Sequence, residues 1–322
     1  MGKFFLRFFL VVLIVVFFAT IFLIYFGLET DKFDNLIKSK ANEVNSYVKL
    51  DFQRTKIHLN PTELNLVVKL QKPKILVTDN EIILSKLDLF LPIRAFITSD
   101  FILKRVEISF AKNDIKDLTK ITNIFLPKII NKKLNKIFYE GKLEGEFIIP
   151  FDKDGKIERN YGFSGKVSNA IINLTKEFSI KNLTTEVIHT KEEEANRFQI
   201  IINEGSIYDL ALAGSKIDLK REKNKIMVKS LLHTSGKLNF SQVKKISSIA
   251  GLNIENFKDI NGITDLKTNI SFNLNKQFRL ENLSYETQGD ISYFEIHTKE
   301  KENIKKYLPE YDPKIILKDS HI

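Results

Sequence analysis

Residues 270–274 read Ile270-Ser271-Phe272-Asn273-Leu274, with an apolar residue at every second position. Successive side chains of a β-strand point to opposite faces of the sheet, so this period predicts a strand with one buried face. The same alternation recurs in shorter runs, at Leu64-Asn-Leu66, Leu87-Asp-Leu89, Val106-Glu-Ile108, Leu210-Ala-Leu212 and Ile226-Met-Val228. The chain is therefore predicted to be mainly β.

Polar segments rich in Asp, Asn and Gly separate these runs. They include Asp79-Asn80, Asp152-Lys-Asp154-Gly155, Asn203-Glu-Gly205 and Gln288-Gly289-Asp290. Their spacing is that of connections between successive antiparallel strands, not of crossovers in a parallel sheet. The pattern predicts an antiparallel, up-and-down meander.

A 14-residue segment recurs 100 positions later in the chain. Residues 173–186 (NLTKEFSIKNLTTE) and 273–286 (NLNKQFRLENLSYE) agree at seven positions without a gap. The frequency of Asn, Leu and Lys in this chain raises the number of chance matches. We interpret the echo as a strand, a polar turn and a new strand that recur in equivalent layers of a repetitive sheet.

An uncharged stretch of 21 residues runs from Phe8 to Leu28, FFLVVLIVVFFATIFLIYFGL. About 20 apolar helical residues cross a bilayer core, whereas the apolar part of a signal peptide is about 7–15 residues and precedes a small-residue cleavage site. Residues 22–28 contain no such site. Lys3 and Arg7 precede the span, which predicts a cytoplasmic N-terminus and a single-pass anchor, with the bulk of the chain outside the cytoplasm.

Two helices are predicted from apolar residues at intervals of three and four. One runs from Asp31 to Val48, with Asp31 as its cap and with apolar Phe33, Leu36, Ile37, Ala41, Val44 and Val48 on one face. The other runs from Ser241 to Ala250, capped by Ser241 and ended by Gly251.

A third helix, Leu126 to Phe138, is amphipathic and basic. Its polar side carries Lys128, Lys132, Lys133 and Lys136. Such a helix docks on an anionic membrane surface, or it covers the open end of a sheet with its lysines in water. Both interpretations stay open, and the four lysines are our candidates for membrane-surface contact.

No catalytic or metal-binding motif is present in the sequence. The five histidines are far apart, Cys is absent, and there is no Gly-x-Ser-x-Gly elbow, P-loop or dinucleotide-binding loop. The formal charge is +10, but basic and acidic residues alternate without an aromatic-rich basic stripe. We therefore expect no enzyme activity, no catalytic residue, no metal, no cofactor and no nucleic-acid partner.

The order of these parts resembles one known family. A basic N-terminus, one span and an amphipathic helix precede strands reading ILVTDNEIILSKLDL (75–89) and FILKRVEI (101–108). Later segments read GKLEGEFII (141–149), FSGKV (163–167) and GKLNFS (236–241). This arrangement is similar to that of the AsmA-like envelope proteins, particularly the YhdP-type branch related to TamB.

The resemblance implies an elongated, curved antiparallel β-sheet, groove-like and repetitive, with a few short amphipathic helices. It implies a protein of the bacterial inner membrane, N-terminus in the cytoplasm and bulk in the periplasm, that binds phospholipid acyl chains and assists phospholipid transport between the two membranes. The apolar residues of the alternating runs would line the groove, although packing in a closed core is equally open for each. These residues are Leu87, Leu89, Val106, Ile108, Leu210, Leu212, Ile270, Phe272 and Leu274.

We divide the chain into a cytoplasmic tip and transmembrane anchor (1–31), an N-terminal AsmA-like helix and β region (32–125), and the basic helix with the repetitive sheet (126–322). Many relatives are longer, so other envelope proteins or further copies of the chain are expected partners. The first alternative function is an anchored envelope scaffold or outer-membrane assembly factor that transfers no lipid. The second is a hydrolase with a compact pocket and a perturbed acid or base.

Overall fold

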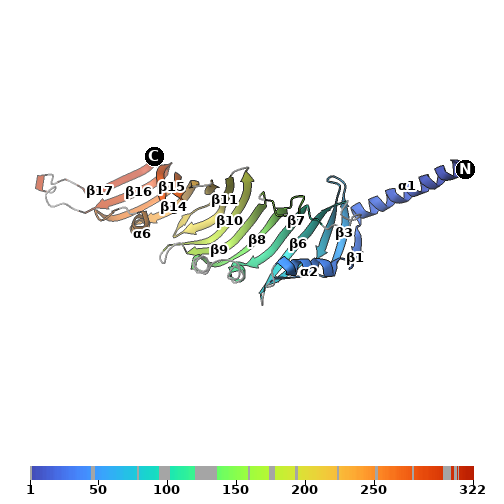
Figure 1. Cartoon of the computed structure of the whole chain (residues 1–322). Coiled ribbons are helices and arrows are strands. Elements are labelled where there is room, and N and C mark those ends of the chain that lie inside the picture. Colours follow the sequence, from blue (N-terminus) through green and yellow to red (C-terminus); the bar gives the residue numbers. More distant parts are fainter. Residues whose placement is uncertain are drawn as a thin grey trace. The chain divides into compact units, whose positions relative to one another are not determined.

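The structure is a computed structural model, shown in Figure 1. It describes residues 2–44, 48–77, 80–93, 102–119, 136–158, 160–173, 178–192, 195–222, 225–250, 253–277, 279–299, 306–307, 310 and 312–322.

The helices and strands follow one another along the chain in a mainly β order. The helices are α1 (Gly2–Tyr25), α2 (Asp34–Val44) and α6 (Phe240–Ala250). The strands are β1 (Leu28–Thr30), β2 (Val48–Asp51), β3 (Arg54–Asn60), β4 (Asn65–Gln71), β5 (Lys74–Val77), β6 (Asn80–Pro92), β7 (Arg105–Asp114), β8 (Phe138–Pro150), β9 (Gly162–Asn173), β10 (Ser179–Glu192), β11 (Ala195–Ile207), β12 (Leu210–Ala211), β13 (Lys216–Arg221), β14 (Lys225–Asn239), β15 (Phe257–Asn275), β16 (Leu280–Thr298) and β17 (Lys314–His321). The prediction of a mainly β chain with a few helices is confirmed.

The chain forms two compact units. Unit 1 comprises Met1–Asn113 and Leu143–Ser164, and unit 2 comprises Asp114–Lys142 and Gly165–Ile322.

In unit 1 the strand β3 pairs with β1 and β4, and β6 pairs with β4, β5 and β7. Two strands pair with the same edge of β6: β5 pairs with its first residues and β4 with its last. β5 also pairs with β2. All these pairings are antiparallel.

In unit 2 the strands from β13 to β17 pair in sequence order, all antiparallel. The strands β12 and β13 both lie between β11 and β14. Each of them pairs with β11 and with β14, so these four pairings form a closed ring. β11 also pairs with β10. The meander predicted from the turn signals is therefore confirmed for this run of strands.

Several predicted boundaries are wrong. The helix predicted over 31–48 begins at Asp34, and Val48 starts β2. Leu64 is not in a strand but in the turn before β4, with a left-handed φ of 51° and 67% of its surface exposed. The helix predicted over 126–138 lies outside the described residues up to 135, and Phe138 already belongs to β8.

The cap of α6 also differs from the prediction. Asn239, not Ser241, caps the helix: its Oδ1 accepts a hydrogen bond from the Gln242 amide at 3.0 Å, and Gln242 Oε1 accepts one from the Asn239 amide at 2.8 Å. This reciprocal pair is a capping box. It satisfies two backbone N–H donors at once, and it therefore stabilises the start of the helix more than the side chain of Ser241 alone would.

The segment predicted to recur shows the same local structure twice. β9 ends at Asn173 and β10 follows, while β15 ends at Asn275 and β16 follows. Asn182 and Asn282, at equivalent positions, both adopt a left-handed φ, 51° and 54°, and the strand register shifts at both places. Asn tolerates this conformation better than most residues. In the described residues the echo therefore encodes, at both places, the end of one strand and a bulge in the next.

A polar cluster joins β16 to β17. Glu295 accepts hydrogen bonds from Tyr293 Oη, from His297 Nε2 at 2.6 Å and from Lys314 Nζ at 2.6 Å. The Lys314 ammonium first, then the Tyr293 and His297 hydrogen bonds, lower the pKa of Glu295 from its ordinary value of 4.5 to about 2. All three contacts favour the ionised carboxylate.

We predict that this cluster makes β16 and β17 acid-sensitive. A carboxyl group with a lowered pKa in the folded state stabilises that state fully above its unfolded pKa and loses this effect as the pH falls through the folded value. The thermal unfolding midpoint of the full chain should thus fall more steeply between pH 4.5 and 2.5 in the native chain than in Glu295→Gln. The exposed Glu255→Gln is the control, and equal slopes in native chain and Glu295→Gln would contradict the prediction.

Candidate functional site

An apolar cavity of about 760 Å³ lies in unit 1 between α2 and the sheet. Cavities of this size hold single small organic ligands. Of its lining residues only Glu43 carries an ionisable side chain. The lining comprises Phe33, Leu36, Ile37, Ala41, Glu43, Leu50, Ile57, Leu66, Val68, Leu87, Leu89, Leu91, Leu103, Val106, Ile108, Phe151 and Gly155.

The alternating runs of β6 and β7 form much of the cavity wall. Leu89 lies opposite Val106, and Leu87 lies opposite Ile108. On the other side of β6, Leu89 lies opposite Val68 of β4. Because paired residues of antiparallel strands point to the same face, these side chains make one continuous apolar surface.

Helix α2 forms the opposite wall and is fixed to the sheet by polar contacts outside the cavity. Thr55 Oγ1 donates a hydrogen bond to Asp34 Oδ1 at 2.5 Å, and Lys38 Nζ lies 3.3 Å from Asp51 Oδ1. The Lys38 ammonium also lies 4.8 Å from the centre of the Phe52 ring. The apolar residues of α2 are therefore held toward the sheet.

The cavity reaches the surface beside α2. Three of its lining residues, Leu36, Glu43 and Gly155, are exposed, and Leu36 exposes 37% of its surface. An apolar side chain that is at once cavity wall and surface marks the mouth of the cavity.

The apolar face of unit 1 continues past the cavity as a row of aromatic rings. Phe110 follows Ile108 on the same face of β7, and its ring centre lies 5.6 Å from that of Phe147. The Phe147 ring lies 4.5 Å from Phe163. All three rings are half-buried, so this part of the face is open to solvent in part.

The opposite face of the same sheet is charged. One row across five strands consists of Glu29, Lys56, Lys69, Asp88 and Glu107, each opposite the next. The charged row therefore crosses β6 at Asp88, between the two cavity-lining residues Leu87 and Leu89.

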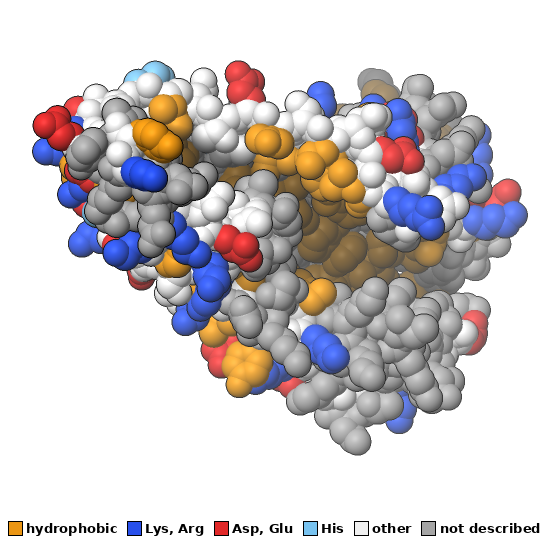
Figure 2. Space-filling view, turned by 90° about the vertical axis from the view of Figure 1, so that its left-hand side faces the viewer, with side chains coloured by type: hydrophobic (Ala, Val, Ile, Leu, Met, Phe, Trp, Pro, Cys, Tyr) orange, Lys and Arg blue, Asp and Glu red, His pale blue; other side chains and the backbone are white. Residues whose placement is uncertain are grey.

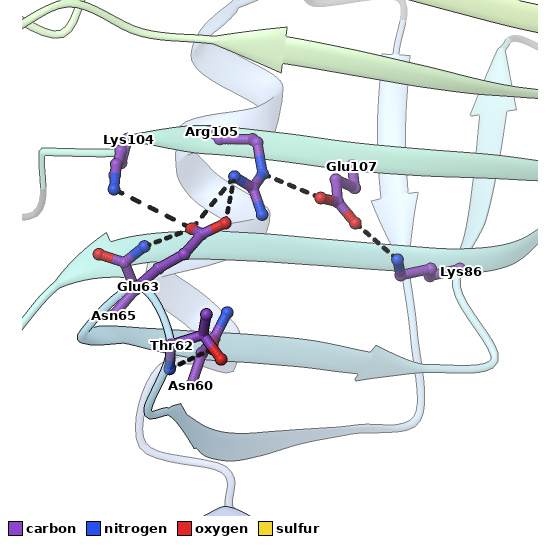
Figure 3. Close-up of polar contacts among 8 residues, drawn as sticks. All are labelled: Asn60, Thr62, Glu63, Asn65, Lys86, Lys104, Arg105 and Glu107. Carbon is purple, nitrogen blue, oxygen red and sulfur yellow. Dashed lines mark hydrogen bonds and ion pairs between the residues drawn. The ribbon is translucent and has the colours of Figure 1, made fainter.

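A network of ion pairs covers this charged face (Figure 3). Arg105 lies between two carboxylates: its Nη1 is 3.1 Å from Glu63 Oε1 and its Nε is 2.9 Å from Glu107 Oε1. Lys86 Nζ lies 2.6 Å from Glu107 Oε2 and 3.6 Å from Asp88 Oδ2. The Arg105 guanidinium also lies 3.9 Å from the centre of the Phe90 ring.

Burial changes the acidity of this network. Asp88 is only 5% exposed, and burial raises the pKa of its carboxyl group, although Lys86 and Lys69 oppose that shift. Burial alone would lower the pKa of Lys86, but its hydrogen bond to Glu107 and the charge of Asp88 together raise it. Lys86 is therefore a cation that both largely buried carboxylates share, in addition to Arg105 at Glu107 and Lys69 opposite Asp88.

The apolar helix α1 is joined directly to this sheet. Residues Phe4–Tyr25 are long and apolar enough to cross a membrane, with a mean hydropathy of 3.1. Gly27, at a left-handed φ of 72°, ends the helix, and a Cβ there would lie 2.7 Å from His58 Nε2 on β3. Two effects lower the pKa of His58: burial of the ring, and then the charge of Lys69. A hydrogen bond between His58 and the backbone of Ile24 opposes this shift. Leu28 then pairs with Ile57.

The other groove candidates lie in unit 2. Ile270, Phe272 and Leu274 share one face of β15 and are half-buried. Leu210 and Leu212 are 4% and 1% exposed, and they pack inside the protein. Lys136 is exposed two residues before β8, whereas Lys128, Lys132 and Lys133 lie outside the described residues.

The face of β15 that carries Phe272 continues across neighbouring strands. Phe272 lies opposite Val228 of β14, Val228 opposite Leu219 of β13, and Leu219 opposite Phe198 of β11. His189 of β10 lies next in the row and stacks on Phe198 with ring centres 4.5 Å apart. Figure 2 shows hydrophobic side chains gathered in a hollow of the surface, with charged side chains around it.

Sequence reasoning identified only four of the seventeen lining residues as groove candidates, Leu87, Leu89, Val106 and Ile108. Phe33, Leu36 and Ile37 were recognised as one face of a helix, but nothing in their spacing says that they stand apart from the sheet. Ile57 alternates with Leu59 in β3, so its signal was present in the sequence, whereas Val68 lies in a run too uniformly apolar to show alternation. Val68 could have been assigned to the cavity wall only from the pairing of the strands.

The described residues contain no group of three or more His, Asp or Glu side chains placed to hold a metal ion. No protein-family model, no curated protein and no solved structure matches this chain. The geometry of the cavity and of the two sheet faces is therefore the basis for any functional conclusion.

We predict that Lys86→Met destabilises unit 1 at neutral pH. The change leaves Asp88 and Glu107 without their shared cation, and such a loss costs about 2 kcal/mol. Denaturant unfolding of the full chain, followed by circular dichroism, measures this cost. Because the pKa of Asp88 is raised, the penalty should shrink as the pH falls from 7 and that carboxyl group becomes protonated. The exposed Lys49→Met is the control, and a penalty independent of pH would contradict the assignment.

Proposed function

We propose that this chain is a single-pass, inner-membrane-anchored lipid-binding protein of the AsmA-like type. Its bulk lies in the periplasm, and it assists phospholipid transport between the inner and outer membranes by shielding acyl chains on the apolar face of its sheet. The observation that carries the proposal is the apolar cavity of about 760 Å³ between α2 and the sheet of unit 1.

The cavity is too large to be a packing defect. Voids in well-packed cores are few and rarely larger than a water molecule, whereas this space measures about 760 Å³ and opens at the surface beside α2. Water is a poor filler for an apolar space because it finds no hydrogen-bond partners there. A hydrocarbon chain fits this lining and gains about 0.8 kcal/mol for each buried methylene group.

The lining favours binding over chemistry. Glu43 is its one ionisable residue, and it is exposed at the mouth instead of lying deep among the leucines. A chain held by such walls has no directional contact along its length, so it can slide. This property suits a carrier of acyl chains.

The anchor supports the same proposal. The apolar helix α1 ends at Tyr25, and α2 begins at Asp34, so few residues separate the end of the span from the cavity wall. Lys3 and Arg7 at the other end of α1 favour a cytoplasmic N-terminus. Unit 1 would then stand at the outer surface of the inner membrane, where phospholipids are available.

The half-buried apolar faces extend this surface beyond the cavity. The rings of Phe110, Phe147 and Phe163 continue it in unit 1, and the row through Phe272 provides a second such face in unit 2. The alternative of an anchored scaffold without lipid transfer requires the cavity to be empty of lipid, which the following experiments test.

We predict that a photo-crosslinking residue in the cavity captures lipid in living cells. Benzoylphenylalanine at Ile108, which lines the cavity, should form a phospholipid adduct on the full chain, detected by mass spectrometry after irradiation. The same residue at Ser109, the next position on the opposite face of β7, should form none. Equal labelling, or no lipid at either position, would favour the scaffold.

We predict that a charge in the cavity removes this adduct. Leu89→Glu places a carboxylate among apolar side chains, which cannot solvate it, and the yield of lipid adduct at Ile108 should drop about tenfold. Leu89→Met keeps the volume and the apolar character and should keep the adduct, as should Leu64→Glu at an exposed turn. Circular dichroism of each variant excludes unfolding, and an unchanged adduct in folded Leu89→Glu would remove Leu89 from the binding surface.

A further inference from the structure

The mouth of the cavity in unit 1 lies between a helix and a loop that both carry charged side chains. Its exposed lining residues are Leu36 and Glu43 on α2 and Gly155 in the loop between β8 and β9. We call residues 151–157 the mouth loop, because Phe151 and Gly155 both line the cavity. A ligand whose apolar part fills the cavity leaves its polar end at this mouth, since a charge buried among leucines is unfavourable.

The backbone of the mouth loop is held by its own hydrogen bonds. Asp152 Oδ1 accepts hydrogen bonds from the amides of Asp154 and Lys156, at 2.9 and 2.8 Å. At the start of the loop, the Phe151 amide donates a hydrogen bond to the Lys104 carbonyl at 2.9 Å. These bonds form without a ligand, so little further ordering of the loop opposes binding.

Two lysines of the mouth loop are placed to contact a phosphate group. Lys153 and Lys156 stand on either side of Gly155 in the sequence, and both are exposed. Neither has a carboxylate partner within the part of the chain that the structure describes. A Cβ built at Gly155 would meet no atom within 4 Å, so the space beside this residue is open. Lysine ammonium groups on flexible stems are common contacts for phosphate.

The helix side of the mouth carries a carboxylate. Glu43 lies in the last turn of α2 and is the one ionisable residue among those that line the cavity. Together with Asp152 and Asp154, it gives the mouth three carboxylates against the two lysines of the loop. The mouth therefore has no excess of positive charge that would favour an anionic headgroup.

We propose that the mouth selects phospholipids whose headgroup carries a primary ammonium group, such as phosphatidylethanolamine. The lipid phosphate contacts Lys153 and Lys156, and the ammonium group donates hydrogen bonds to Glu43. This inference rests on the proposed function, since it requires the acyl chains of the same lipid to lie in the cavity.

The two contacts have different consequences for selectivity. Glycerophospholipids share the phosphate, so the lysines raise affinity without distinguishing headgroups. An ammonium group adds an attraction to Glu43, whereas phosphatidylglycerol has no cation and brings its negative charge close to that carboxylate. Ion pairs at exposed sites are weak, so the expected preference is about threefold to fivefold.

A photo-crosslinking residue inside the cavity measures this preference without touching the headgroup. The full chain with benzoylphenylalanine at Ile108, which lines the cavity, is reconstituted into vesicles of equal parts phosphatidylethanolamine and phosphatidylglycerol. The lipid adducts are identified by mass spectrometry after irradiation. Adducts of phosphatidylethanolamine should exceed those of phosphatidylglycerol about threefold to fivefold.

Two sets of variants change different quantities in this experiment. Glu43→Gln should bring the ratio of the two adducts to about one, and Glu43→Lys should reverse it, because a cation at this place attracts the anionic lipid. The double variant Lys153→Gln/Lys156→Gln should lower the total adduct about threefold and leave phosphatidylethanolamine in excess.

Lys49 and Glu81 provide matched controls. Both lie opposite Leu76 in neighbouring strands, and Lys49 directly precedes the cavity-lining Leu50, so both belong to the other face of the sheet. Both are exposed. Lys49→Gln and Glu81→Gln should alter neither the ratio nor the total, and circular dichroism checks that every variant is folded.

The outcomes separate this inference from the proposed function. Phospholipid adducts whose ratio is one in the native chain, or whose ratio Glu43→Lys leaves unchanged, overturn the selectivity and keep lipid binding. An unchanged total in the double lysine variant overturns the phosphate contact. The absence of any phospholipid adduct on the native chain overturns both proposals.

Discussion

The strand register of unit 1, and with it the cavity, depends on the alternation of apolar and charged residues at Leu87-Asp88-Leu89. The two leucines line the cavity while the carboxylate between them belongs to a row of charges on the other face. A shift of one residue in the pairing of β6 would place Asp88 among apolar side chains and expose both leucines. The cost of burying the charges of Asp88 and Lys86 among apolar side chains, away from Lys69 and Glu107, therefore fixes the register, and the register determines which residues line the cavity.

The cavity follows from a helix that covers an apolar face without filling it. Most globular domains pack a helix against a sheet until no space remains, because voids forfeit dispersion contacts. Here the polar contacts of Asp34 and Lys38 attach α2 at its outer side. The inner side of this segment presents Leu36, Ile37 and the small Ala41 toward the space without filling it. The lipid-binding proposal rests on this unfilled apolar space.

The sequence predicted the strands and much of the apolar wall because both depend on local period. Leu87, Leu89, Val106 and Ile108 alternate with charged residues and lie where that pattern indicates, on one face. Other assignments needed information that is not local. Leu212 follows the same alternation, yet it lies after the short strand β12 and is only 1% exposed. Likewise the capping residue of α6 depends on the side chain of Gln242, three residues farther on.

Both units have an apolar sheet face, and they differ in what covers it. In unit 1 the helix α2 covers it and leaves a cavity. In unit 2 the row contains half-buried Phe198, Leu219 and Phe272 and buried Val228, although no described helix covers it as α2 does in unit 1. Half-buried apolar side chains that form a continuous row across several strands mark a surface suited to an apolar partner. The row through Phe272 therefore differs from the cavity of unit 1 in having no described helix as an opposite wall, so a partner would have to supply that wall itself.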